Sequence, residues 1–156
     1  MKKLLLYVIV LLVATNTLLA FSETDVRYLR QICNYLQVDY RLMLAIAEQE
    51  SDYNWSAIGN HGELGAFQVK PGTFLWLRDK VAKSYGLGNL EGVSAEVFYT
   101  NHIRQMEAAT LYVRWLMDQY PELDKDEKTI QVLLRYNASS RKDQYATEVM
   151  MIYKEL

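Results

Sequence analysis

The chain has 156 residues, of which 51% are hydrophobic and 23% are charged, enough for one compact domain with a sizeable core but not for two. Its 17 Lys and Arg against 19 Asp and Glu give a formal net charge of −2. This balance excludes the basic excess with which nucleic-acid-binding proteins neutralise phosphates. We expect a ligand that is neutral or held by hydrogen bonds and stacking, for which 12 Tyr and three Trp offer flat faces.

The N-terminus has the pattern of an export signal. Two lysines precede a long apolar run, which a short polar stretch interrupts before it ends in the small residue Ala20. This arrangement predicts a signal peptide over residues 1–20 and a mature domain over 21–156. The alternative is an uncleaved membrane anchor, because residues 4–22 contain no charge. Both interpretations predict a domain outside the cytoplasm, periplasmic or secreted, with membrane contact only through the leader.

The first two helices are predicted from their start signals. Ser22 and Asp25 are typical of a helix start, and apolar residues then recur at helical spacing up to about Gln37. Asp39 can cap a second helix that runs out near Ser51. Both helices carry one apolar face, so we expect them to pack against a common core.

The middle of the chain is predicted to be less regular. Helical periodicity is lost over residues 52–70, which are rich in Asn and Gly. This segment is expected to be irregular and can include a small β excursion. Pro71 is typical of a first helical turn and predicts a helix to about Val81. A loop is expected at 86–89, and Ser94 is expected to begin a short turn.

Three more helices complete the prediction. A long helix is expected over about 101–120, halted by Pro121, and others over about 124–137 and 141–153. No alternating strand of useful length occurs in the sequence. The fold class is therefore all-α, or an α-dominated α+β fold with its irregular part at 52–70.

Nothing in the sequence predicts a metal or cofactor. Cys33 is the only cysteine, which excludes an intramolecular disulfide, and its helical spacing predicts a small buried hydrophobe. His61 and His102 are far apart in sequence, and neither has an obvious partner. No His, Cys and carboxylate cluster has metal-ligand spacing, and no Gly-rich phosphate loop is present.

Glu50 is the first candidate for chemistry. It closes an apolar helix beside a glycine-containing loop, where a carboxyl can be held partly out of water. Desolvation raises the pKa of such a carboxyl and keeps it protonated near neutral pH, as a general acid requires. Most Glu residues near a helix end are simply solvated, so the position of Glu50 alone is weak evidence of catalysis. The neighbouring motifs strengthen it. Glu48 points elsewhere on the helix and is assigned a structural role.

Several short motifs surround this carboxyl in a characteristic order. They are Gln-Glu-Ser at 49–51, Gly-Glu-Leu-Gly-Ala-Phe-Gln-Val-Lys-Pro-Gly-Thr at 62–73, the helix segment 105–113, Arg-Tyr-Asn-Ala at 135–138, and the segment 145–149. With these motifs the chain resembles the soluble lytic transglycosylases, relatives of goose-type lysozyme, over roughly residues 25–153. It is most similar to their small members, which often accompany secretion machines or pili that cross the cell wall. Each motif alone is unspecific, and their common order carries the resemblance.

The resemblance implies a lysozyme-like helical domain that cleaves peptidoglycan glycan strands, with no cofactor. It assigns Glu50 as the catalytic acid and base, and Ser51 as a hydroxyl that orients the sugar or the acid. Gln68 would line the substrate groove, Tyr136 would lie close to the catalytic carboxyl, and Asn137 would position the substrate or that carboxyl. Components of a secretion or pilus machine are the further partners that it implies.

Two more substrate-binding assignments and several departures follow from the same comparison. Phe67 replaces a Met of the family pattern and keeps the groove apolar, and Tyr145 would pack behind the site. Arg135 replaces a small residue, Gln105 replaces an Asn, and serines stand at 139–140 where Gly is expected. These departures affect subsite preference more than chemistry.

The reaction implied by the resemblance needs only one carboxyl. Ordinary glycosidases pair an acid with a second carboxylate. In lytic transglycosylases the attacking group is the C6 hydroxyl of the muramic acid itself. That tethered nucleophile makes an external water unnecessary and leaves a 1,6-anhydro end.

Two alternatives remain open on the sequence. Glu63 is expected to be an exposed loop charge, like Asp52 and His61, but as a second carboxylate it would make the enzyme a water-using muramidase. The other alternative is a non-catalytic, peptidoglycan-binding scaffold. The retained acid Glu50 argues against a scaffold, because a degenerate relative would more easily have lost it.

Overall fold

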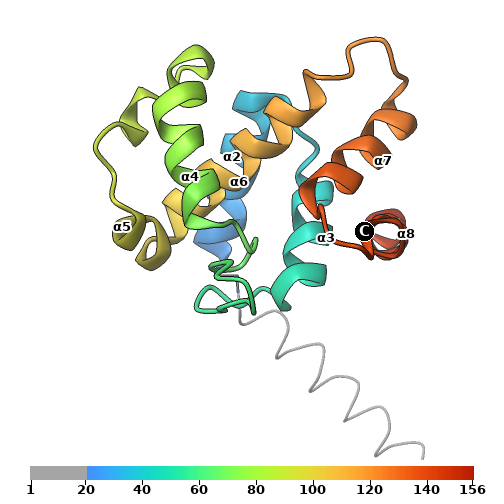
Figure 1. Cartoon of the computed structure of the whole chain (residues 1–156), viewed down its shortest axis with the longest axis horizontal. Helices are drawn as coiled ribbons and strands as arrows, with labels where there is room; N and C mark the ends of the chain where they lie inside the picture. Colours follow the sequence, from blue (N-terminus) through green and yellow to red (C-terminus); the bar gives the residue numbers. More distant parts are fainter. Residues whose placement is uncertain (1–20) are drawn as a thin grey trace, which may run out of the picture.

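The computed structural model describes residues 21–156 (Figure 1), so the signal peptide predicted at 1–20 lies outside the described residues. Seven α-helices and no strand occur in this part of the chain. The helices are α2 (Glu23–Leu36), α3 (Tyr40–Ser51), α4 (Pro71–Trp76), α5 (Ala95–Thr100), α6 (His102–Met117), α7 (Lys125–Tyr136) and α8 (Lys142–Glu155). The α-dominated fold class is confirmed. Among residues 21–156, no helix is both long and apolar enough to cross a membrane.

The predicted start of α2 is confirmed, and it is a capping box. The hydroxyl of Ser22 accepts a hydrogen bond from the backbone N–H of Asp25 at 3.1 Å, and the Asp25 carboxylate accepts one from the N–H of Ser22 at 2.9 Å. This exchange satisfies two backbone donors that the first helical turn would leave open. Cys33 lies on the inner face of the helix and is buried, as its spacing predicted.

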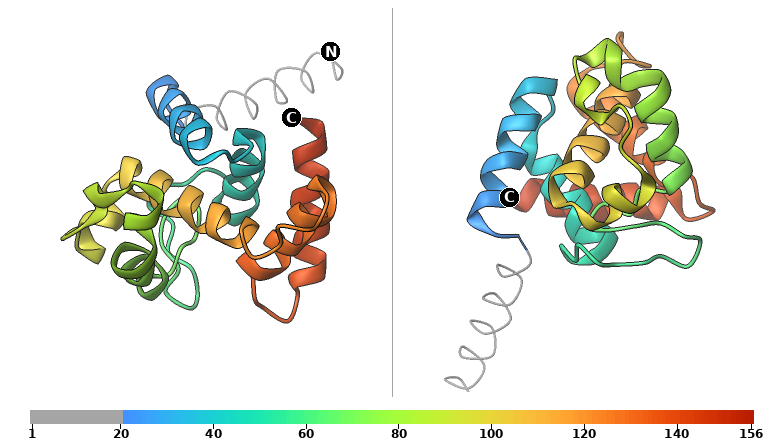
Figure 2. Two further views of the ribbon diagram at one scale, coloured as in Figure 1. Left: turned by 90° about the horizontal axis from the view of Figure 1, so that it is seen from above. Right: turned by 90° about the vertical axis from the view of Figure 1, so that its left-hand side faces the viewer.

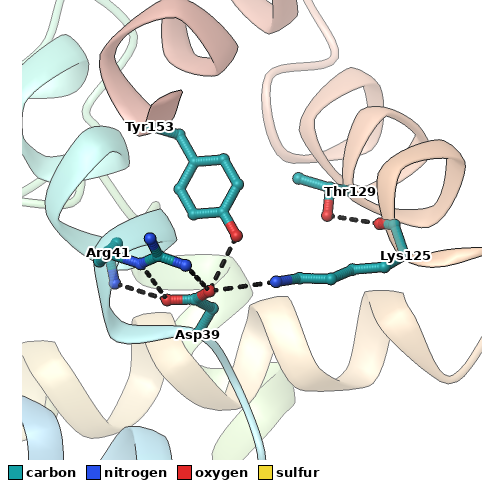
Figure 3. Close-up of polar contacts among 5 residues, drawn as sticks. All are labelled: Asp39, Arg41, Lys125, Thr129 and Tyr153. Atoms are coloured by element: carbon teal, nitrogen blue, oxygen red, sulfur yellow. Dashed lines mark hydrogen bonds and ion pairs between the residues drawn. The ribbon is translucent and has the colours of Figure 1, made fainter. Parts of the chain in front are cut away.

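Asp39 caps α3 and also joins it to the C-terminal helices (Figure 3). Its carboxylate accepts hydrogen bonds from the N–H of Arg41 at 3.0 Å and from the Tyr153 hydroxyl at 2.8 Å, and it pairs with Lys125 at 3.4 Å. Burial acts to raise the pKa of Asp39, but hydrogen bonds from Arg41 and Tyr153 outweigh it and hold that pKa well below its usual value.

Asp39→Ala is expected to lower the free energy of unfolding by about 1–2 kcal/mol, the cost of a lost N-cap. Because the folded-state pKa of Asp39 is depressed, its contribution is present above the ordinary value of 3.8 and is lost as pH falls below it. Urea denaturation at pH 7 and pH 3 measures this. The difference in free energy of unfolding between wild type and Asp39→Ala should be smaller at pH 3 than at pH 7. The control Asp126→Ala, in the exposed first turn of α7, should lose less stability at pH 7 than Asp39→Ala.

The helix predicted over 71–81 changes its winding after one and a half turns. The α4 helix ends at Trp76 and continues as a π-helix, η1 (Leu77–Val81), followed by a 3₁₀ turn, η2 (Ala82–Tyr85). The prediction of a single α-helix is therefore wrong for its second half. A π-helix bonds residue i to i+5, here the N–H of Ala82 to the carbonyl of Leu77. The wider turn brings both residues to the same face, where both are buried.

Two other expectations are corrected in the middle of the chain. The loop expected at 86–89 contains a 3₁₀ turn, η3 (Gly88–Leu90), and the short turn expected at Ser94 is the start of the helix α5. The Ser94 hydroxyl accepts a hydrogen bond from the N–H of Val97 at 3.2 Å, which caps α5. The β excursion considered for 52–70 amounts to isolated antiparallel bridges of Leu64 with Ile58 and Val69.

The helix α6 forms the centre of the fold. Ala108, Ala109, Leu111 and Val113 on it are fully buried, and α6 packs against α2, α5 and α7. Figures 1 and 2 show α4 and α5 on one side of the molecule and α7 and α8 on the other, with α6 running between them. The helix α8 packs against α3 and α7. This packing brings the C-terminal ends of α3 and α7 to the edge of the irregular segment 52–70.

Candidate active site

A pocket of about 700 Å³ lies where the end of α3, the segment 52–70 and the end of α7 meet. The floor and walls also take residues from α4 and α6. The lining residues are Glu50, Gly59, Asn60, His61, Glu63, Gln68, Val69, Lys70, Thr73, Tyr112, Arg135, Tyr136, Asn137, Ala138, Ser139 and Ser140. Of the seven site residues predicted from the sequence, Glu50, Gln68, Tyr136 and Asn137 line this pocket.

Glu50 stands in the last turn of α3 with its carboxyl at the pocket wall. The pKa of Glu50 is raised to about 7, chiefly by burial; Tyr145 acts to lower it, and the negative charge of Glu63 adds to the rise. A carboxyl with this pKa is protonated in a large fraction of molecules at neutral pH. It can therefore donate a proton to a ligand in the pocket, and accept one afterwards.

Tyr145 lies close to this carboxyl. Its side chain is only 5% exposed, and its hydroxyl is buried without a hydrogen-bond partner among residues 21–156. The hydroxyl is near enough to Glu50 to favour the ionised carboxyl, but lies outside hydrogen-bonding geometry. It is a donor close to the carboxyl and out of reach of solvent.

Tyr136 and Asn137 reach the pocket because α7 ends there. The Tyr136 hydroxyl donates to the carbonyl oxygen of Phe67 at 2.8 Å, which ties α7 to the irregular segment. Burial, and next the charge of Glu50, raise the pKa of Tyr136 well above its usual value, so the hydroxyl remains a neutral donor. The Asn137 side chain accepts from the N–H of Ser139 at 3.2 Å, and Asn137 lines the pocket.

Gln68 lines the pocket from the irregular segment 52–70. Its backbone is in the left-handed region, with φ of 48°, and its amide donates to the carbonyl of Gly65 at 2.8 Å. Gly59 lies against this side chain, and a Cβ at Gly59 would collide with the side-chain oxygens of Gln68 and Glu63. The glycine is therefore what allows the backbone to approach both groups.

Ser51 and Phe67 do not line the pocket. The Ser51 hydroxyl donates to the carbonyl of Ala66 at 2.8 Å and accepts from the N–H of Asn54 at 3.0 Å, so it fastens the irregular segment to α3. The Phe67 side chain is 1% exposed and packs in the core. In this structure the Ser51 hydroxyl and the Phe67 ring contact protein groups, and their assignment as substrate contacts stays a prediction.

Gln105 was noted in the sequence only as a departure from the family pattern, and its position shows a larger role. Its side chain is almost fully buried on α6 and accepts from the N–H of Ala66 at 3.0 Å. It donates to the carbonyls of Trp55 at 3.2 Å and Tyr99 at 2.6 Å. A Cβ at Gly65 would collide with this amide. A polar residue at a buried helical position was the available signal for this anchor.

The prediction that Glu63 is an exposed loop charge is wrong. Its side chain is 21% exposed, accepts from the N–H of His61 at 3.0 Å and pairs with Lys70 at 3.3 Å. Burial acts to raise the pKa of Glu63, but backbone N–H groups and Lys70 outweigh it and lower that pKa. The pocket therefore holds one carboxyl that keeps its proton near neutral pH and a second that is ionised. Asp52 and His61 are exposed, as predicted.

Each histidine has a carboxylate neighbour that the sequence did not reveal. His61 Nδ1 lies 3.9 Å from Glu63, and His102 Nδ1 lies 3.5 Å from Asp25, while the His102 ring stacks on Trp55. Within residues 21–156, no group of three or more His, Cys, Asp or Glu residues is arranged to hold a metal ion.

A second hollow of about 250 Å³ adjoins the first on the side of α8. Glu50, Asn137 and Ser139 belong to both, and Tyr145 lines the smaller one. The carboxyl of Glu50 thus lies at the junction of two adjoining hollows. This arrangement suits an extended polymer, with one part of the strand on each side of the acid.

Comparison with known proteins identifies the family of the chain. The family model described as Transglycosylase SLT domain matches residues 27–149, which include Glu50 and every other residue that lines the larger pocket. Comparison of the full sequence with curated proteins gave no match. The family model covers well over half of the chain, and its members degrade peptidoglycan. The chain therefore belongs to the SLT transglycosylase family and is a peptidoglycan lytic transglycosylase.

Proposed function

We propose that Glu50 acts alone as acid and then base on the β-1,4 bond between N-acetylmuramic acid and N-acetylglucosamine, and that it leaves 1,6-anhydro ends. The observation that carries this proposal is a single carboxyl with a pKa raised to about 7 by burial, at the junction of two hollows. Such a group can both donate and recover a proton near neutral pH.

The proposed reaction proceeds in two proton transfers. Protonated Glu50 gives its proton to the glycosidic oxygen as the bond from that oxygen to C1 of the muramic acid breaks. The resulting carboxylate takes the proton of the C6 hydroxyl as O6 bonds to C1. Glu50 ends in its starting state, and no water is consumed. Because the nucleophile belongs to the substrate, correct placement of the sugar supplies much of the rate.

The neighbouring side chains suit sugar binding in this proposal. The amides of Gln68 and Asn137 both line the pocket and can hydrogen-bond the N-acetyl and hydroxyl groups of the sugar. The Tyr112 ring offers an apolar face in the same pocket. Tyr145 is given the role of stabilising the carboxylate form of Glu50 through its buried hydroxyl.

One observation favours a second candidate function. Glu63 is ionised and lines the same pocket as Glu50, so it can be the second carboxylate of a muramidase that activates a water. Its pairing with Lys70 and with the N–H of His61 argues instead for a role in holding the loop, because these contacts occupy both oxygens.

Product mass separates the two functions. Digestion of purified peptidoglycan is expected to release muropeptides one water lighter than hydrolysis products, and Glu63→Gln should release the same products. The negative charge of Glu63 raises the pKa of Glu50, so its removal should lower that pKa. As the pH is increased, the rate of the variant should therefore begin to fall at a lower pH than the rate of wild type. Mass spectrometry and a pH–rate profile measure both effects. Full-mass reducing ends that disappear in Glu63→Gln would establish the muramidase instead.

We also propose that the protein is exported and opens the wall locally for a secretion or pilus apparatus. The basic, apolar and small-residue pattern of residues 1–20 supports export, and the resemblance to small specialised transglycosylases supports the assembly role. Mass spectrometry of the protein recovered from the periplasm tests the leader. In a deletion strain, apparatus assembly should be restored by wild type and not by Glu50→Gln.

A further inference from the structure

A row of aromatic rings extends from the pocket along α6 and α4. Tyr112 of α6 and Thr73 of α4 both line the pocket. Three residues further along each helix, about 4.5 Å, stand Trp115 and Trp76. Residues three apart share a helix face, so both tryptophans continue the faces that α6 and α4 present to the pocket.

The rings contact one another in sequence. Tyr136 and Tyr112 have ring centroids 5.3 Å apart, and Tyr112 lies nearly parallel to Trp115 at 6.3 Å. Trp115 then meets the edge of Trp76 at 4.7 Å. The row is therefore continuous from Tyr136 to Trp76. Its inner end lies close to the acid, because the charge of Glu50 contributes to the raised pKa of Tyr136.

Trp76 is the outer end of this row and is open to solvent. It is 36% exposed, whereas Trp55, in the core between Phe21 and His102, is 8% exposed. An indole packed on one side and open on the other leaves apolar surface that a ligand can cover. Trp76 does not line the pocket itself, but the row of rings joins it to Tyr112, which does, so the ligand expected there is a further part of the one bound in the pocket.

A polar residue lines the same end of the pocket. The Arg135 guanidinium donates to the Tyr120 hydroxyl at 3.1 Å and lies near enough to Tyr112 to lower its pKa against the effect of burial. An apolar floor with a few polar groups beside it is the usual composition of a small-molecule site. Pyranose rings match it, because they present C–H groups on their faces and hydroxyl or N-acetyl groups at their edges.

We infer that Trp76 and Trp115 form a distal subsite, which stacks a sugar ring of the glycan strand beyond the pocket of Glu50. This subsite rests on the proposed function for the identity of the strand, a β-1,4-linked N-acetylhexosamine polymer. It makes strand length a determinant of binding: a long strand reaches Trp76, and a short one that fills only the pocket does not. Remote contacts of this kind contribute affinity and position the bond that reacts.

Binding of N-acetylglucosamine oligomers to the purified Glu50→Gln protein tests the subsite without turnover. Isothermal titration calorimetry should show tighter binding of a hexamer than of a dimer. Trp76→Ala should weaken the hexamer by about tenfold, as expected for a lost stacking contact, and leave the dimer unchanged. Trp76→Phe should retain most of the affinity, because it keeps an aromatic face. Tyr35→Ala removes an exposed aromatic side chain from α2 and serves as the matched control.

The outcomes separate the subsite from the proposed reaction. An equal loss for dimer and hexamer in Trp76→Ala, or a Phe variant as weak as the Ala variant, would overturn the subsite. A hexamer that binds no more tightly than the dimer to the parent protein would overturn it too. The assay contains no bond cleavage, so a length-dependent loss would support the subsite even if the peptidoglycan products proved to be those of hydrolysis.

Discussion

Glu50→Gln is expected to reduce the release of muropeptides from peptidoglycan by about 10³-fold or more. General acid and base catalysis each contribute about 10²–10⁴-fold, and the proposed reaction takes both from this one carboxyl. Gln keeps the size of the side chain and removes its proton transfer. Quantitative mass spectrometry of soluble products measures the effect. Activity within tenfold of wild type would contradict the assignment.

Glu48→Gln is the matched control, because Glu48 lies on the same helix two residues earlier. Its carboxylate accepts from the Tyr53 hydroxyl at 2.8 Å, and it lines neither of the two hollows at Glu50. It should retain nearly full activity. Loss of activity in both variants would indicate damage to α3 and not the loss of a catalytic group.

Stability gives a second readout for Glu50→Gln. Folded Glu50 binds its proton up to about pH 7, while the unfolded chain releases it near the ordinary value of 4.5. The wild-type protein therefore loses stability as pH rises through this interval, by roughly 3 kcal/mol at most. Gln cannot ionise, so the variant should gain stability relative to wild type between pH 4 and pH 8. Urea denaturation at the two values measures the difference.

Gln105→Leu is expected to lower the free energy of unfolding by about 3 kcal/mol or more and to abolish most activity. The substitution leaves the N–H of Ala66 and the carbonyls of Trp55 and Tyr99 without their partner. Each buried group left unsatisfied costs about 1–3 kcal/mol. The segment that carries Gln68 and Glu63 would lose its anchor to α6. Thermal unfolding and digestion of peptidoglycan measure the two effects.

Gln31→Leu is the control for this second variant. Gln31 is exposed on α2, so the same change of side chain should alter stability by less than about 0.5 kcal/mol. A Gln105→Leu protein as stable as this control would contradict the anchoring role. A variant that is destabilised but keeps wild-type product rates at low temperature would show that Gln105 contributes to stability and not to the arrangement of the site.

The helices could be predicted because their signals are local. Ser22, Asp39 and Asp124 each cap a helix through a side chain that reaches a backbone N–H two or three residues ahead. Apolar spacing over one or two turns indicated the buried faces, and Cys33 follows that rule. The change from α-helix to π-helix after Trp76 was not predicted. It depends on which residues the core must bury and not on local propensity.

The sequence by itself determined the helical fold class, the irregular segment at 52–70 and the place of Glu50 at the end of an apolar helix. These depend on residues within a few positions of one another. Only the tertiary structure decided that Glu63 is partly buried beside Lys70, that Gln105 holds Ala66 from 39 positions away, and that Trp76 meets Trp115. Such contacts join segments distant in the chain, and their geometry follows from how α3, α4, α6 and α7 pack, which no local pattern encodes.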